Sequence, residues 1–393
     1  MIKDNQMHYV SIERKENIMF SFNTHDSDDN MKDRTWLVSF ILIVLICLIG
    51  IGALVIHVDP YFHYHAPNEN YFYELVSYKE RNVNDGITRH FDYDSIITGT
   101  SMTENFKTTE AETIYGGKFI KLPYAGGYYN EINMNLEKAF ELHPELKTVI
   151  RGLDSGYMMV GDGDKRTDMG KYPEYLYDNN IFNDVKYIFN KDVIKNCISG
   201  QILGKLKGEK LGITSFDEYA NWMYLYEGQF TREEVLKDYV IPVKPEETYS
   251  LTEEEADIVR TNIRKNVTKL AKENPDAEFY YFFTPYSVAW WGTLYGNGEL
   301  HKHLQMERIV IEEVLECENI HFYSFSNFPE IVQNICNYKD IHHYGEDVNT
   351  LLLQYMKEGK GLLTKDNYED YLSEVENMYE TYDYTLLTIE DTI

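Results

Sequence analysis

The chain has 393 residues and a formal net charge of −28, from 37 Lys and Arg against 65 Asp and Glu. Phosphate groups repel a chain this acidic, which argues against nucleic acid as a partner. Hydrophobic residues make up 43% and charged residues 26%, the balance of a packed globular protein and not of a disordered one. Four cysteines are too few to hold a fold of this size together by disulfides.

The segment from Trp36 to Val58 has the length and composition of a membrane-spanning helix. It contains no Asp, Glu, Lys or Arg, and as a helix it would extend about 34 Å, enough to cross a bilayer. A buried core helix is the alternative, but core helices seldom stay apolar on every face for this long. The polar residues before the run and its length also argue against a cleaved signal peptide. We therefore expect an uncleaved anchor at 36–58.

Basic residues flank this segment unequally. The first Lys or Arg after it is Lys79, whereas the residues before it include Lys3, Arg14, Lys15, Lys32 and Arg34. The cytoplasmic flanks of membrane helices carry the excess of Lys and Arg. The sequence thus predicts a cytoplasmic tail at 1–35 and an extracytoplasmic location, at the cell membrane, for everything after the anchor.

Residues 59–92 are rich in aromatic residues, Asn and Pro without a clear period, and we expect a membrane-proximal stalk there. The aromatic side chains suit the lipid interface. His63 and His65 lack a third partner and fit such a belt better than a metal site.

From residue 93 onward, strand-like and helix-like segments alternate. Runs rich in β-branched and aromatic residues are expected as strands, and amphipathic segments as helices. This alternation is typical of a parallel sheet covered by helices. The expected strands lie at 94–100, 118–127, 147–154, 277–285 and 320–326, and the expected helices at 102–117, 129–144, 250–275, 300–316 and 345–361.

We therefore predict an α/β domain at 93–360 built on a five-stranded parallel sheet flanked by helices. An insertion at about 155–248 interrupts the alternation and is expected to form a lid or side wall; its Asp162, Asp164 and Asp168 lack the full spacing of a calcium loop and favour a solvated turn. The acidic tail at 361–393 is expected as a solvated amphipathic helix.

Three places where a strand passes into a loop hold residues suited to chemistry, because ligands of parallel α/β sheets bind beyond the carboxyl ends of the strands. Ser101 follows the first strand, where it is either an exposed nucleophile or only the N-cap of the next helix. Gly126 follows the second strand, where a glycine lets backbone N–H groups approach a substrate oxygen. Asp340 and His343 precede the last helix, where a carboxylate can fix the tautomer of an imidazole base.

These motifs, in this order, resemble the blocks of the SGNH (GDSL-like) hydrolase superfamily. Gly99-Thr100-Ser101 is similar to the G-D-S block with its nucleophilic serine, Gly126 to the oxyanion glycine of the second block, and Asp340 with His343 to the D-x-x-H block. The resemblance implies a flavodoxin-like three-layer sandwich and Ser-His-Asp catalysis by Ser101, His343 and Asp340. A one-residue error between His342 and His343 stays open.

The third block departs from the family pattern. Gly152 and Asp154 are similar to the glycine and aspartate of G-x-N-D, whereas Leu153 stands where the family has its oxyanion asparagine. Loss of one oxyanion donor typically lowers the rate about 100- to 1000-fold. The sequence looks closest to membrane-anchored members that act on surface polysaccharides and to D-alanyl-transfer proteins of teichoic acid synthesis.

Other residues bear on the substrate. The chain has 34 tyrosines, and aromatic faces stack on sugar rings. Tyr286, Trp290 and Trp291 follow the fourth strand, where they either line a substrate wall or pack in the core. Arg151 is expected to pair with Asp154 or to hold an anionic substrate group.

The sequence thus predicts a membrane-anchored serine esterase or O-acyltransferase that acts on acyl groups of a cell-surface polysaccharide or wall polymer. It needs no metal or organic cofactor, and the resemblance implies a membrane-bound O-acyltransferase as a partner. The alternative is a non-catalytic member of the same fold that binds glycan or a partner during polymer assembly.

Overall fold

The computed structural model describes residues 24–75, 79–168 and 170–388. The chain from Leu54 onward forms one compact unit, and the part before it forms another. The α-helices are α1 (Thr24–Val58), α2 (Glu80–His90), α3 (Thr108–Tyr115), α4 (Tyr129–Leu142), α5 (Val185–Ile188), α6 (Ser199–Lys207), α7 (Arg232–Leu236), α8 (Glu253–Ile263), α9 (Lys269–Glu273), α10 (Val288–Gly296), α11 (Leu300–Val314), α12 (Pro329–Val332), α13 (Glu346–Lys357) and α14 (Tyr368–Thr381).

Helix α1 carries the apolar segment that the sequence predicts to be a membrane anchor. The helix Met31–Val58 is long and apolar enough to cross a bilayer, because an 18-residue window within it has a mean hydropathy of 3.1, and it contains the predicted segment 36–58. The orientation stays a prediction. Of the basic residues on which it rests, Lys3, Arg14 and Lys15 lie outside the described residues, and Lys32 and Arg34 are exposed near the start of the apolar stretch.

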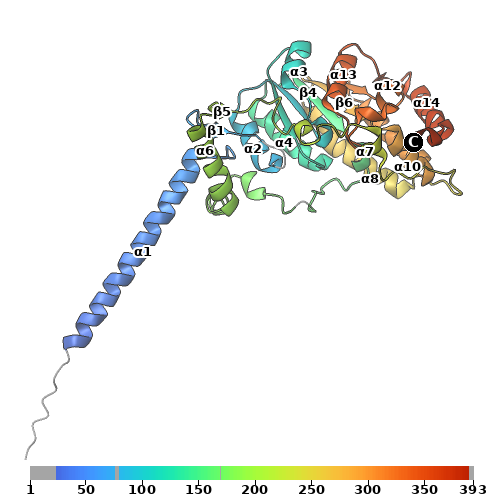
Figure 1. Ribbon diagram of the computed structural model, residues 1–393. Helices are drawn as coiled ribbons and strands as arrows, with labels where there is room; N and C mark the ends of the chain where they lie inside the picture. Colours follow the sequence, from blue (N-terminus) through green and yellow to red (C-terminus); the bar gives the residue numbers. More distant parts are fainter. Residues whose placement is uncertain (1–23, 76–78, 169, 389–393) are drawn as a thin grey trace, which may run out of the picture. The chain divides into compact units, whose positions relative to one another are not determined.

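The main sheet has the order β3-β2-β4-β6-β7-β8, and its first five strands are parallel. Every residue of β2 and β3 is buried, because helices cover both faces of a parallel sheet. Helices α3 and α13 pack together on one face, and α4, α8 and α11 cover the other (Figure 1). The strands are β2 (Ser95–Gly99), β3 (Phe119–Pro123), β4 (Thr148–Leu153), β6 (Glu278–Phe283), β7 (Ile320–Tyr323) and β8 (Leu362–Leu363).

The sheet has six strands where the sequence predicts five. The sixth, β8, comes from the expected tail and pairs antiparallel with β7. The chain reverses after α13 at Gly359 and Gly361, whose φ angles of 74° and 75° favour glycine. A strand of two residues shows no alternation by which the sequence could have revealed it.

The segment expected as a stalk is part of the folded unit. The carboxylate of Asp59 accepts hydrogen bonds from the backbone N–H groups of His63, Tyr64 and His65 and from the hydroxyl of Tyr187. Helix α2 packs on α4, and β1 (Phe72–Tyr73) pairs in parallel with β5 (Gly212–Ile213) from the insertion. The prediction of a stalk was therefore wrong. The polar and aromatic contacts that hold this segment follow no sequence period that could have revealed them.

The tail also differs from its prediction as a solvated helix. Helix α14 packs on α10 and α11 and buries one face, so that Tyr379 is fully buried and stacks on Trp291 with ring centroids 4.5 Å apart. Trp291 is therefore a core residue. The apolar spacing of the tail was visible in the sequence, but its burial depends on partners far away in the chain.

Candidate active site

A chain of hydrogen bonds links three of the predicted residues at the carboxyl edge of the sheet. The hydroxyl of Ser101 lies 2.9 Å from Nε2 of His343. On the other side of the ring, Nδ1 of His343 lies 2.9 and 3.0 Å from the two carboxylate oxygens of Asp340. Of the two neighbouring histidines, the structure therefore places His343, and not His342, against the serine.

Ser101 is held in a tight turn directly after β2. Gly99 has a φ of 150°, and a Cβ atom there would lie 2.5 Å from Thr103, so the turn requires a residue without a side chain. Thr100, not Ser101, caps the short 3₁₀ turn at Ser101–Thr103, because its hydroxyl accepts from the Met102 N–H. The hydroxyl of Ser101 thus stays free to meet His343. The helix expected at 102–117 begins only at Thr108, so its N-terminus does not directly follow the serine.

Hydrogen bonds to the Asp340 carboxylate favour its ionised form. The N–H groups of His342 and His343 both donate to its Oδ1 at 2.8 Å. Burial opposes ionisation of this carboxyl, but the hydrogen bonds from His343 outweigh it and hold the pKa of Asp340 well below its usual value. A carboxylate in this position fixes the imidazole tautomer in which Nε2 accepts a proton.

Ser101, His343 and Asp340 are called the triad below. Ser101 and His343 face a cavity of about 410 Å³. Gly126 lies in its wall with a φ of 55°, and its carbonyl accepts from Arg166. No hydrogen bond within the described residues uses the N–H groups of Ser101 or Gly126, so both can donate to a substrate oxygen. The cavity is lined by Ser101, Met102, Glu104, Ala125, Gly126, Asp154, Tyr157, Arg166, Trp222, Tyr226, Tyr286, Lys339, His342 and His343.

The third block contributes Asp154, and not Leu153, to this cavity. Leu153 is fully buried in the core, whereas Asp154 follows the end of β4 and lines the cavity. Thr100 donates a hydrogen bond to the Asp154 carboxylate. Burial raises the pKa of Asp154 to about 6, and the bond from Thr100 opposes this rise.

Arg151 does neither of the things expected of it. It is fully buried, and its guanidinium donates to the carbonyls of Asn266 at 2.8 Å and Tyr129 at 3.3 Å. It lies over the rings of Tyr129 and Tyr281. Arg151 therefore neither pairs with Asp154 nor reaches a substrate, because the strand directs its side chain under α4.

Tyr286 lines the cavity as expected. Its ring centroid lies 4.3 Å from that of Trp290 and 5.4 Å from that of His342. Tyr286 and His342 line the cavity beside Ser101, and Trp290 packs against Tyr286 without lining it.

The insertion supplies a further wall of this site, which the sequence did not predict. Trp222 donates from its indole N–H to the Ser101 carbonyl at 3.2 Å and meets the His343 ring edge-on. Lys339 lies 3.9 Å from the ring centroid of Tyr226 and 3.4 Å from the Asp340 carboxylate. The position of Lys339 next to Asp340 was a usable signal, whereas nothing in the insertion marks Trp222.

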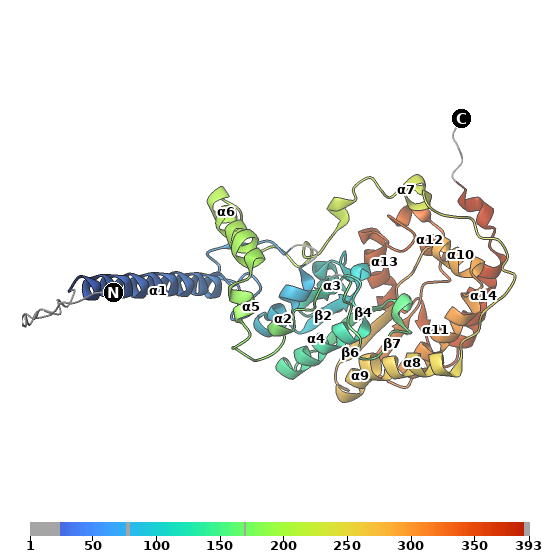
Figure 2. The ribbon, with the colours of Figure 1, turned by 90° about the horizontal axis from the view of Figure 1, so that it is seen from below.

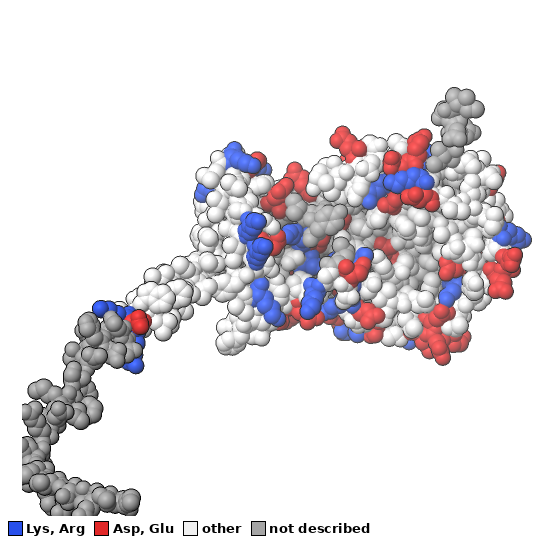
Figure 3. Space-filling model, turned by 60° about the horizontal axis from the view of Figure 1, so that its bottom comes forward, with Lys and Arg blue, Asp and Glu red and all other residues white. Residues whose placement is uncertain are grey.

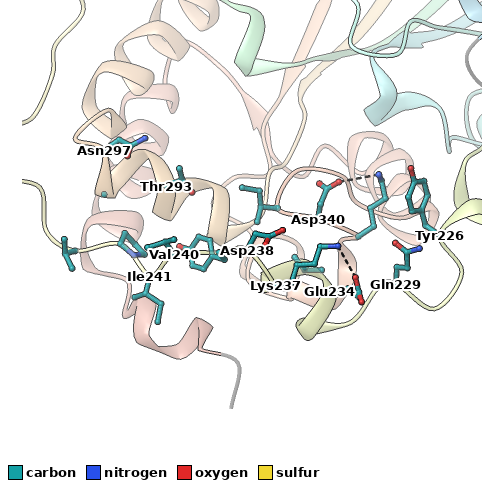
Figure 4. Close-up of a pocket in the computed structure, with 17 residues that line it drawn as sticks. Tyr226, Gln229, Glu234, Lys237, Asp238, Val240, Ile241, Thr293, Asn297 and Asp340 are labelled. Atoms are coloured by element: carbon teal, nitrogen blue, oxygen red, sulfur yellow. Dashed lines mark hydrogen bonds and ion pairs between the residues drawn. The ribbon is translucent and has the colours of Figure 1, made fainter. Parts of the chain in front are cut away.

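A larger cavity of about 710 Å³ adjoins the first and shares Tyr226 and Lys339 with it. Asp340 lies at its border, and Figure 4 shows side chains of the insertion and of α10 around it. Its polar side chains, among them Gln229, Asp238, Thr293 and Asn297, stand between apolar ones such as Val240 and Ile241.

The described residues contain no group of three or more His, Cys, Asp or Glu that could hold a metal ion. In comparisons with known proteins, no family model, curated protein or solved structure matches this chain.

Proposed function

We propose that this protein is a membrane-anchored serine esterase or O-acyltransferase of SGNH type that acts on acyl groups of a cell-surface polysaccharide or wall polymer. The observation that carries the proposal is the hydrogen-bonded chain from Ser101 through His343 to Asp340. A nucleophile, a base and an orienting carboxylate in contact are the signature of nucleophilic acyl transfer.

The mechanism follows from the positions of these atoms. Nε2 of His343 takes the proton of Ser101 as the serine oxygen attacks the acyl carbonyl, and Asp340 stabilises the imidazolium that forms. The N–H groups of Ser101 and Gly126 bind the developing oxyanion. His343 then protonates the leaving alcohol, and the acyl group passes from Ser101 to water in an esterase or to a sugar hydroxyl in a transferase.

The strand order supports the SGNH-type assignment. Counting only the five parallel strands in chain order, they lie in the order 2-1-3-4-5, as in flavodoxin-like sheets. Ligands of such sheets bind where the order reverses, between the first and third strands. Ser101 follows β2 and Asp154 follows β4, which are these two strands.

The polymer would occupy the larger cavity, because that cavity adjoins the triad and combines polar with apolar walls. Sugar rings present hydroxyl groups at their edges and C–H groups on their faces, and need both kinds of contact. A membrane-bound O-acyltransferase partner would supply the acyl group in the transferase form of the proposal.

The non-catalytic alternative has one observation in its favour: Leu153 is buried and supplies no oxyanion donor. A binding protein of this fold has no need of an activated serine. The intact contact between Ser101 and His343 favours the enzyme.

A fluorophosphonate probe, which reacts with activated serines, separates the two functions in the full chain held in detergent. We expect the wild type to be labelled at Ser101, and Ser101→Ala and His343→Ala to lose at least 100-fold in labelling rate. His301→Ala, at an exposed position of α11 outside the cavity, is the matched control and keeps the label. A folded wild type that takes no label would contradict the catalytic function.

A further inference from the structure

The insertion contains a segment, 181–211, with an unusual number of exposed apolar side chains. Phe182 is 86% exposed, Leu206 is 76% exposed and Ile181 is 73% exposed. Water disfavours such side chains when they gather in one place, and gathered apolar side chains mark a surface that is covered in the working protein. The residues are Ile181, Phe182, Val185 and Phe189 around α5 and Leu203 and Leu206 on α6.

The same segment is the basic part of an acidic chain. It holds six lysines against Asp184, Asp192 and Glu209, whereas the whole chain has a net charge of −28. All six lysines are exposed, and within the described residues none of them forms a salt bridge. They are Lys186, Lys191, Lys195, Lys205, Lys207 and Lys210. No carboxylate of the described residues neutralises these six charges, so an external anion can do so.

The way helix α6 packs on β1 leaves two of its apolar residues exposed. Gly204 faces inward, where a Cβ atom would lie 2.6 Å from the ring of Phe72, so α6 lies close against β1. Leu203 and Leu206, one turn apart, lie outside the face that packs on β1 and are exposed. Figure 2 shows α5 and α6 standing apart from the main sheet.

Contacts tie this segment to the residues that follow the apolar helix. Tyr187 of α5 donates to Asp59, the residue after the end of α1 at Val58. Lys205 of α6 lies 5.4 Å from the ring centroid of Tyr71. In Figure 3, blue side chains are most frequent toward the left end of the folded unit, the end that α6 occupies in Figure 1.

We propose that the segment 181–211 is a platform that lies on the surface of an anionic phospholipid bilayer. Its apolar side chains enter the boundary between headgroups and acyl chains, and its lysines bind the phosphates. Lipid is the occupant that satisfies both kinds of side chain, and the segment contacts residues that follow the apolar helix. The platform rests on the membrane anchor of the proposed function and does not depend on the serine chemistry.

Site-specific photocrosslinking of the full chain tests this platform. A photoreactive phenylalanine analogue replaces Phe182 or Leu206, and the protein is reconstituted in nanodiscs of phosphatidylglycerol and phosphatidylcholine. We expect lipid adducts at both positions by mass spectrometry. The analogue at Ile258, an exposed apolar position on α8, is the matched control and forms none.

Charge is tested separately. In Lys205→Gln/Lys207→Gln/Lys210→Gln, the adduct at Leu206 should fall more than tenfold, because each lysine near an anionic surface contributes about a fivefold factor in binding. The exposed set Lys244→Gln/Lys272→Gln/Lys357→Gln is the control and leaves the adduct unchanged.

Several results would overturn the platform. One is incorporation into nanodiscs without lipid adducts at Phe182 and Leu206, and another is equal adducts at Ile258. Crosslinks in native membranes that join these positions to a protein in place of lipid would replace the platform with a partner interface. A chain that does not enter nanodiscs would instead overturn the anchor, whatever the result of serine labelling.

Discussion

Two carboxyl groups line the small cavity of the triad and a third, Asp340, lies behind His343; the three bind protons differently because their neighbours differ. Asp340 accepts several hydrogen bonds, and its pKa is well below the usual value. Asp154 has one donor, Thr100, and burial raises its pKa to about 6. For Glu104, burial and then the nearby Glu80 raise the pKa well above its usual value. Of the three, Asp340 therefore keeps its negative charge to the lowest pH, and it lies where an imidazolium would form.

Asp154→Asn should make stability less sensitive to pH. The Asp154 carboxyl binds its proton more tightly in the folded protein than in the unfolded chain, so its contribution to stability is present below about pH 4. That contribution is lost as the pH rises through about 6. Relative to the wild type, the variant should gain up to about 3 kcal/mol in free energy of unfolding between pH 4 and pH 7.5.

Urea unfolding of the full chain in detergent, at a series of pH values, measures this difference. Asp164→Asn, at an exposed position of the insertion, is the control and should follow the wild type. An Asp154→Asn curve parallel to that of the wild type would show that Asp154 does not carry the pH dependence.

For single residues, short motifs predicted the triad because each member lies where a strand ends or just before a helix begins. The end of an apolar run, or the start of an amphipathic one, identifies such places in a sequence. Arg151 could not be placed in the same way. It lies on a marked strand, but its partners are backbone carbonyls of α4 and of the turn after α8, and carbonyl groups leave no trace in a sequence.

Among the elements, helix α14 decides how the far edge of the sheet is closed. Tyr379 donates to the Ser326 carbonyl at 2.6 Å and stacks on Trp291. Tyr371 of the same helix is hydrogen-bonded to Ser324. Helix α14 therefore joins α10 to the loop after β7.

Tyr379→Ala should destabilise the protein strongly. It removes a fully buried ring and a buried hydrogen bond, and losses of this kind cost about 3–5 kcal/mol. Thermal unfolding of the full chain measures the effect. Glu380→Ala, at the exposed position next to it, is the matched control with a change of under about 0.5 kcal/mol. Equal melting temperatures for the two variants would contradict the packing of α14 and support the solvated helix expected from the sequence.

The sequence predicts the five parallel strands because each is a short run of ordinary length rich in β-branched or aromatic residues. It misses β1, β5 and β8, which have two residues each, and it misses the packing of residues 59–92. These parts are held by hydrogen bonds such as those of Asp59, and no periodic pattern accompanies them.

In the whole molecule, the insertion joins the two cavities beside the triad. Its residues wall the larger cavity opposite α10, and Tyr226 and Lys339 belong to both cavities. A small probe needs only the cavity of the triad, whereas a polymer held as we propose extends into the larger one. The two kinds of substrate therefore respond differently to a change that fills the larger cavity.

Thr293→Trp places an indole in the larger cavity, on the face of α10 that lines it. We expect this variant to release acetate from an O-acetylated oligosaccharide at least tenfold more slowly than the wild type, because the added ring occupies space that sugar rings need. Fluorophosphonate labelling of Ser101 should stay within twofold, since the triad is untouched. Ile258→Trp, on the outer face of α8, is the matched control and changes neither rate. If Thr293→Trp slows both reactions equally, the ring has disturbed the triad; if it slows neither, the polymer does not use this cavity.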